Sequence, residues 1–201
     1  MFITNEKRYP QLIVDIIKQE YDNYNKGDAD FSVTELIASP LERVLKERHD
    51  HELEIDVDRL IFMFNGSMAH AVMEKLKVDY VKDMEHRMFI KHDGVTISGR
   101  LDVVYALANK ILLDDVKFTG KGVLKNGARK SWIRQANLYR YMYNKTKGVL
   151  VDGLGILAFL RNATMYEMKC CRLPIQVYEL DAVERFMSKQ IALNKVIDWK
   201  I

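Results

Sequence analysis

The sequence predicts an α/β fold with a central mixed β-sheet flanked by helices. Apolar residues recur at helical spacing through most of the N-terminal part. Strand-like runs separated by turn signals follow between about residues 87 and 118, and a helical pattern then precedes another strand. At 201 residues the chain has the length of a single domain, which we expect to span residues 1–201.

The N-terminal part is predicted to be helical. The first helix covers Gln11–Tyr24 and ends at a polar break. Ser32 and Glu35 have the spacing of a capping box, which predicts that a short helix begins there. The helix restarts at Ser39-Pro40, with Pro40 at its first helical position, and runs to about His49.

The pattern changes from helical to strand-like at about residue 87. Before it, residues 58–84 predict one long amphipathic helix, or two in succession that meet near Gly66. After it, we expect a three-stranded meander with strands at about 88–90, 95–107 and 111–118 and turns at Asp93-Gly94 and 108–110.

The C-terminal part alternates between helices and strands. A loop rich in glycine and lysine, Thr119–Lys130, precedes a helix at about 131–146 and a strand at about 154–161. We expect a strand pair within Tyr166–Tyr178, interrupted at Pro174, and a final helix capped by Asp181 that runs to about Val196.

Charged residues stand where core residues are expected in the meander. Asp115 and Lys117 lie two apart in one strand, so their side chains share a face of the sheet. Antiparallel pairing across the 108–110 turn places Asp102 opposite Asp115. Two facing carboxylates repel unless a cation lies between them, and oxygen ligands suit Mg²⁺ or Mn²⁺. A simpler interpretation stays open, in which Asp115 and Lys117 are an edge-strand charge pair and Asp102 is solvated.

Four motifs in this order resemble the PD-(D/E)XK nucleases, and most closely their RecB-type exonuclease branch. They are the helical histidine of Gly66–His70, the Gly-x-x-Asp of Gly99–Asp102, the Asp-x-Lys of Asp115–Lys117 and the Gln-x-x-x-Tyr of Gln135–Tyr139. The resemblance implies a restriction-endonuclease-like core over about residues 58–162, with a helical N-terminal part and a C-terminal hairpin plus helix.

The resemblance also implies a role for each matched residue. The metal ligands would be His70, Asp102, Asp115 and the Val116 carbonyl. Lys117 would be the catalytic lysine, and Gln135 and Tyr139 would orient the catalytic residues or DNA. The chain departs from the family pattern at Asp115, where glutamate is commoner, and at Leu101, where the family name has proline.

Other candidate ligands are weaker. Glu85 precedes the predicted meander and is expected at most to reach the metal through a water. His49 and His51 lie at a helix end and are interpreted as solvated. The two cysteines, Cys170 and Cys171, are too few for an iron–sulfur cluster, so none is expected.

The net charge of +3 hides an uneven distribution of charge. Nine of the 31 Lys and Arg residues lie between residues 116 and 150, a stretch without Asp or Glu, which leaves −6 on the rest of the chain. Such a block is the electrostatic pattern expected for binding to a phosphate backbone. The expected DNA contacts are Lys121, Lys125, Arg129, Lys130, Arg134 and Trp132, the last by stacking on bases.

Together these features predict a Mg²⁺- or Mn²⁺-dependent deoxyribonuclease, with the resemblance favouring an exonuclease. A non-catalytic nucleic-acid-binding module and an endonuclease acting on RNA or branched DNA stay open as alternatives. No signal peptide or membrane span is evident, so we expect a cytoplasmic protein of a bacterial or phage-infected cell. A recombination or replication protein is a possible partner; strand preference, polarity and oligomeric state are not determined by the sequence.

Overall fold

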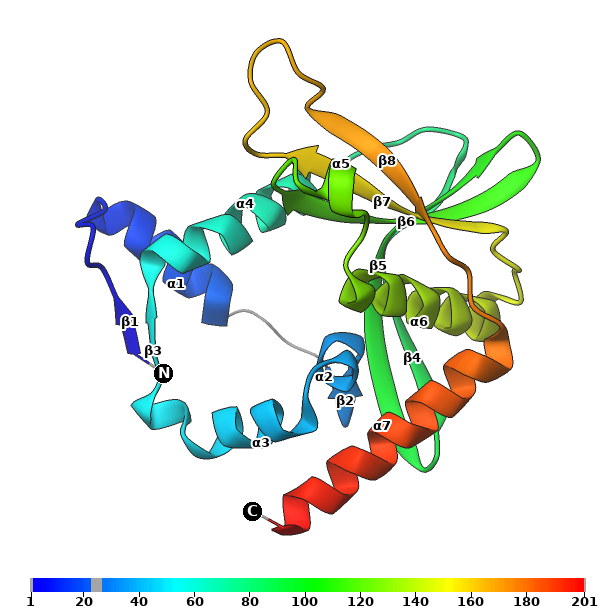
Figure 1. Ribbon diagram of the computed structural model, residues 1–201, viewed down its shortest axis with the longest axis horizontal. Helices are drawn as coiled ribbons and strands as arrows, with labels where there is room; N and C mark the ends of the chain where they lie inside the picture. The colour runs from blue at the N-terminus through cyan, green and yellow to red at the C-terminus, as the bar shows by residue number, and fades with distance from the viewer. Residues whose placement is uncertain (1, 23–26, 201) are drawn as a thin grey trace.

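A computed structural model describes residues 2–22 and 27–200 of the chain (Figure 1). The strands are β1 (Phe2–Thr4), β2 (Phe31–Ser32), β3 (Glu54–Asp56), β4 (Val81–His92), β5 (Val95–Leu107), β6 (Lys110–Thr119), β7 (Gly153–Leu160) and β8 (Cys170–Ile175). The helices are α1 (Gln11–Asp22), α2 (Val33–Ile37), α3 (Pro40–Arg48), α4 (Val57–Met73), α5 (Val123–Asn126), α6 (Lys130–Lys147) and α7 (Leu180–Lys200), with a short 3₁₀ turn, η1 (Asp50–Glu52), after α3.

The central sheet has six strands and is mixed. Its order is β2-β5-β6-β7-β8, with β4 also paired to β5. β5 runs antiparallel to β4 and β6, whereas β7 runs parallel to β6 because α6 connects them. The predicted α/β class, with a central mixed sheet flanked by helices, is confirmed.

Local sequence signals formed the expected structures at several points. Ser32 accepts a hydrogen bond from the Glu35 amide, and the Glu35 side chain accepts one from the Ser32 amide, which completes the capping box. Ala108 and Asn109 both adopt positive φ, 50° and 61°, as a tight two-residue hairpin turn requires. This turn sets the β5–β6 register, in which Val103 lies opposite Asp114; the ladder ends there, one step before the predicted Asp102–Asp115 pair.

The helix expected over residues 58–84 is shorter than predicted. α4 continues through Gly66 as a single helix but ends at Met73, and β4 begins at Val81 rather than at residue 87. Periodicity extended the helix too far because Leu76, taken as a core position, is 49% exposed. Long backbone pairing with β5 determines the conformation of residues 81–86 in place of local preference.

The C-terminal strand pair predicted within Tyr166–Tyr178 is also wrong. There is one strand, β8, and it passes through Pro174. Proline is tolerated because β8 is an edge strand of the sheet, where one side of the backbone needs no partner. Asp181 lies in the first turn of α7, which begins at Leu180 and extends beyond the expected end.

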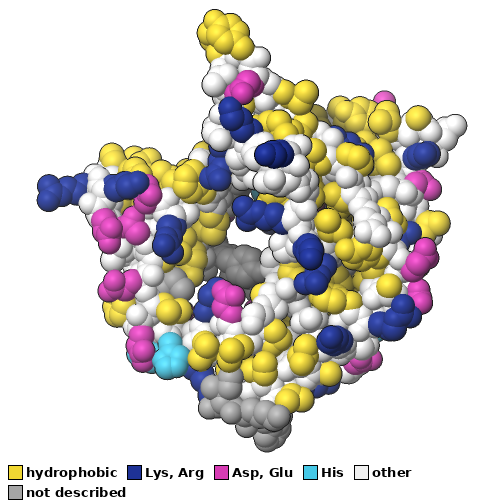
Figure 2. Space-filling view, in the orientation of Figure 1, with side chains coloured by type: hydrophobic (Ala, Val, Ile, Leu, Met, Phe, Trp, Pro, Cys, Tyr) yellow, Lys and Arg dark blue, Asp and Glu magenta, His cyan; other side chains and the backbone are white. Residues whose placement is uncertain are grey.

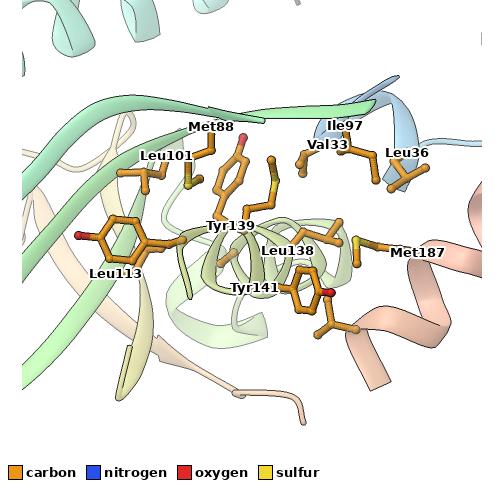
Figure 3. Packing of buried hydrophobic residues seen from close by; sticks show 14 of the residues in the cluster. Val33, Leu36, Met88, Ile97, Leu101, Leu113, Leu138, Tyr139, Tyr141 and Met187 are labelled. Carbon is orange, nitrogen blue, oxygen red and sulfur yellow. The ribbon is translucent and has the colours of Figure 1, made fainter. Parts of the chain in front are cut away.

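Helix α6 packs across the sheet and forms the main core. Figure 3 shows Leu138, Tyr139 and Tyr141 of this helix among apolar side chains from the sheet, α2 and α7. Gly99 makes this close approach possible, since a Cβ atom there would lie 3.0 Å from side-chain atoms of both Tyr139 and Met142. The glycine of the Gly-x-x-Asp motif therefore has a packing role.

A second, smaller core joins α1 and α4. It is built on Val14, Ile17, Val57 and Leu60, and the parallel pair β1–β3 adjoins it in Figure 1. Within residues 2–22 and 27–200, no helix combines the length and apolar character needed to cross a bilayer.

Candidate metal centre

The candidate site lies where β5 and β6 separate. The ladder between these strands ends at Val103 opposite Asp114, one step before Asp102. Asp102 instead accepts a hydrogen bond on Oδ2 from the Val116 amide, at 2.5 Å. The carboxylate thus replaces a ladder hydrogen bond and is held, buried, between the two diverging strands.

Three potential ligands from three elements meet at this point. His70 on α4 contacts Glu85 on β4, with 2.5 Å between Nδ1 and Oε1, and its Nδ1 lies 3.9 Å from Asp102 Oδ1. One ligand atom from each of the three lies within 4.8 Å of the other two. Glu85 reaches this position through an irregular strand conformation, with φ of 48°. A histidine nitrogen and two carboxylates form a donor set that fits a divalent cation.

Asp115 adds an incompletely paired buried carboxylate beside this trio. Its side chain is 1% exposed, and in the described part of the chain Oδ1 has no hydrogen-bond partner. Its other oxygen, Oδ2, lies 2.7 Å from Lys117 Nζ, so the predicted juxtaposition of these two side chains is present.

The electrostatics of the carboxylates also fit a missing positive charge. Burial, and then the charge of Asp115, raise the pKa of Asp102 from 3.8 to about 7. Burial likewise raises the pKa of Asp115. The hydrogen bond to Glu85 raises the pKa of His70, against the opposing effect of burial. A bound cation would favour the ionised carboxylates and neutral histidine that metal ligation needs.

Arg100 holds the second oxygen of Glu85. Its Nε donates to Glu85 Oε2 at 2.8 Å, and its Nη2 donates to Glu74 at 3.0 Å. This arrangement leaves Glu85 Oε1 directed at His70. Arg100 is thus placed to orient a candidate ligand, as outer partners of metal sites commonly do.

Gln135 and Tyr139 lie on α6 and contact one another. Gln135 Nε2 donates to the Tyr139 hydroxyl at 2.9 Å, and both side chains are buried. Tyr139 lies against Gly99 and lines a cavity of about 360 Å³. The pair is therefore next to the motif of β5.

The three candidate ligands line a second cavity of about 290 Å³ between α4, α1 and the sheet. This cavity shares Glu20, Ser67 and Arg100 with the cavity that Tyr139 lines, so the two adjoin. Together they give the candidate metal site access to a larger ligand.

The basic segment does not form one continuous cationic surface. Lys125 and Lys130 are exposed and have no ion pair with the described residues, whereas Lys121 is paired with Glu167 at 2.9 Å. Arg129 lies over the half-buried Trp132 ring at 5.1 Å, and Arg134 lies over the Phe186 ring at 5.4 Å.

At the far end of α6, the remaining positive charges are used within the fold. Arg140 is buried and donates to the carbonyls of Val151 and Tyr178. Lys147 pairs with Asp83 at 3.3 Å. The block of charge seen in the sequence is therefore divided between the surface near α5 and structural contacts.

Sequence reasoning underestimated Glu85. It placed this residue near a metal only through a water, but its carboxylate belongs to the ligand-competent trio. The available signal was an acidic residue just before the predicted meander, which the structure places inside β4. Glu85 could be recognised as a candidate ligand only once β4 was known to begin at Val81 and so to include this residue.

Comparisons with known proteins add a likeness of fold. No protein-family model matches the chain, and no curated protein matches it in sequence. The solved structure of SSO0001 is similar over 91% of this chain and 85% of its own, with a TM-score of 0.63 and 16% identity. A putative exonuclease from Eubacterium rectale matches over 90% of this chain and 73% of its own, with a TM-score of 0.38 and 11% identity.

Proposed function

We propose that this chain is a divalent-metal-dependent deoxyribonuclease of the PD-(D/E)XK type, active with Mg²⁺ or Mn²⁺. The observation that carries the proposal is the convergence of His70, Glu85 and Asp102 beside the buried, incompletely paired Asp115. His70, Asp102 and Asp115 belong to the motifs that suggested the nuclease resemblance, and the fold adds Glu85 to them. Its exonuclease character rests on the RecB-type resemblance.

The residues have complementary roles in this proposal. Glu85 joins His70, Asp102 and Asp115 as ligands, with the Val116 carbonyl completing the set. The cation, when bound, supplies neutralisation of the negative charge that develops on the phosphodiester. Lys117, with its side chain 24% exposed and its ammonium beside Asp115, orients the attacking water and stabilises negative charge on the phosphate. Gln135 and Tyr139 position the β5 motif and the adjoining part of the substrate.

DNA is the proposed substrate because the exposed cations of the α5 region lie directly after the strand that carries Lys117. Lys125, Arg129, Lys130 and Arg134 would contact phosphates, and Lys121 would do so after exchanging Glu167. The proposed partner is a recombination or replication protein, and the proposed location is the cytoplasm of a bacterial or phage-infected cell.

Cleavage assays on linear and closed circular DNA test the proposal. The wild type should degrade linear DNA with Mg²⁺ or Mn²⁺ and lose activity in EDTA, while Asp115→Asn and Lys117→Ala lower the rate at least 100-fold. Lys110→Ala is the matched control, because Lys110 is an exposed lysine of the same strand. Cleavage of closed circular DNA would show that the activity is that of an endonuclease and not of an exonuclease. DNA binding without metal-dependent cleavage would leave only a binding module.

A further inference from the structure

The loop between β7 and β8, residues 161–169, ends in an exposed apolar tip. The exposed fractions of Met165, Tyr166 and Met168 are 74%, 91% and 63%. All three side chains are large, and such side chains are usually at least partly buried. In Figure 1 this loop projects from the body of the molecule above α4 and α5. Figure 2 shows apolar side chains at its end.

This loop is held in shape by specific contacts. The Glu167 carboxylate accepts from the Thr164 amide at 2.8 Å and pairs with Lys121 at 2.9 Å. Lys169 Nζ donates to the Met165 carbonyl at 2.9 Å. These bonds turn the segment back on itself, so Tyr166 is presented outward by a folded loop.

Two contacts attach the loop to elements of the proposed nuclease site. The Asn162 side chain accepts from the Lys121 amide at 2.7 Å, which joins the loop to the basic segment after β6. The Arg161 guanidinium lies 4.2 Å from the centre of the Phe62 ring on α4, the helix that carries His70. The tip therefore belongs to the same surface as the basic residues near α5.

The positive charge of the neighbouring 119–130 segment indicates which kind of partner the tip binds. Residues 119–130 contain Lys121, Lys125, Arg129 and Lys130 and no acidic residue, and Lys125 and Lys130 have no ion pair among the residues described. A partner that is a polyanion and also offers flat apolar faces satisfies both features. Nucleic acid with unpaired bases has this chemistry, because phosphates attract cations while bases stack on aromatic rings.

We propose that Tyr166, supported by Met165 and Met168, is a stacking platform for an unpaired base of nucleic acid whose backbone lies over the 119–130 segment. This inference rests on the part of the proposed function that concerns nucleic-acid binding, and not on cleavage. Tyr166 is thus a substrate-positioning residue and not one of the metal ligands.

Binding measured in EDTA tests the platform separately from catalysis. The probe is a short fluorescein-labelled single-stranded oligodeoxynucleotide, followed by fluorescence anisotropy. Tyr166→Ala should weaken binding about fivefold or more, whereas Tyr166→Phe keeps the ring and should bind within about twofold of wild type. Tyr80→Ala is the control, because Tyr80 is a 55% exposed tyrosine beside β5, where its carbonyl accepts from the Ala106 amide, and this variant should bind as wild type.

Salt dependence separates stacking from backbone contact. Tyr166→Ala should leave the slope of log affinity against log salt concentration unchanged. Lys125→Ala removes one phosphate contact and should make this negative slope shallower by about 0.7 on a single strand. In an oligonucleotide that contains 2-aminopurine, contact with the Tyr166 ring should quench the fluorescence of this base. Tyr166→Ala should remove this quenching.

Three results would overturn the inference. Equal binding by wild type and Tyr166→Ala would remove the platform, even if the wild type cleaves DNA normally in the metal assays. An equal loss in Tyr80→Ala would show a non-specific effect. Tyr166-dependent sedimentation with phosphatidylglycerol vesicles, without an effect on oligonucleotide binding, would assign the tip to a membrane surface.

Discussion

Asp114 and Asp115 are neighbours in β6, yet only Asp114 has a full set of partners. Arg172 donates to both oxygens of Asp114, at 2.7 and 2.9 Å, and Tyr105 adds a hydrogen bond at 2.7 Å. Among the residues that the structure describes, Asp115 has only the Lys117 ammonium, at one oxygen. Because successive side chains of a strand point to opposite faces, one carboxylate is structural and the other is available to a cation.

This difference predicts opposite effects of the same substitution. Asp114→Asn leaves the Arg172 guanidinium without its charge partner and should destabilise the protein by about 3 kcal/mol. Asp115→Asn removes an incompletely compensated buried charge and should leave the metal-free protein as stable as wild type or more so. Denaturant unfolding in EDTA measures both. A larger stability loss for Asp115→Asn would contradict the assignment.

Gly155 tests the same ion pair from the neighbouring strand. A Cβ atom at this position would lie 2.5 Å from Asp114 Oδ1 and 2.8 Å from the Arg172 guanidinium. Gly155→Ala should therefore displace the pair and cost about 2 kcal/mol or more of unfolding free energy. Gly66→Ala is the control, because nothing lies within 4 Å of a Cβ there and the helix should be stabilised slightly.

Glu85 should contribute directly to metal affinity. Glu85→Gln removes the charge while keeping the shape, and we expect it to weaken Mn²⁺ binding at least 10-fold in isothermal titration calorimetry. Arg100→Gln acts only through the orientation of Glu85, so its effect should be smaller. Unchanged Mn²⁺ affinity in Glu85→Gln would restrict the metal site to the residues expected from the sequence.

The contribution of Asp102 to the stability of the metal-free protein should fall as pH rises from about 4 to 7. The folded-state pKa of Asp102 is about 7 against an ordinary value of 3.8, so the folded state binds more protons in this window. Folding then loses up to ~1.4 kcal/mol per pH unit from this group as it ionises. The raised pKa of His70 acts in the same direction, because its stabilising protonated form is also lost at higher pH.

Unfolding across pH in EDTA measures this slope, and Asp102→Asn should flatten it. Added Mg²⁺ should stabilise the wild type more at pH 8 than at pH 5.5, since protons compete with the cation for the same carboxylates. A wild-type stability that does not fall relative to that of Asp102→Asn between pH 4 and 7 would contradict the assignment.

Much of the fold followed from local signals in the sequence. The capping box at Ser32 and the turn at Ala108-Asn109 determine backbone geometry over a few residues, and this geometry formed as expected. The end of α4 and the single strand β8 were missed because strand pairing with distant segments decided them. An edge position that tolerates Pro174 is a property of the sheet and cannot be read from neighbouring residues.

The sequence by itself determined the α/β class and, through the two-residue hairpin turn, the register that brings the Asp102 and Asp115 motifs together. Only the tertiary structure decided that Glu85 joins His70, that Asp114 is neutralised by Arg172, and that much of the positive block is used in internal contacts. The physical reason is that turn and strand geometry act over a few residues. Burial and charge compensation, in contrast, depend on partners that the fold brings from positions 15 to 58 residues away.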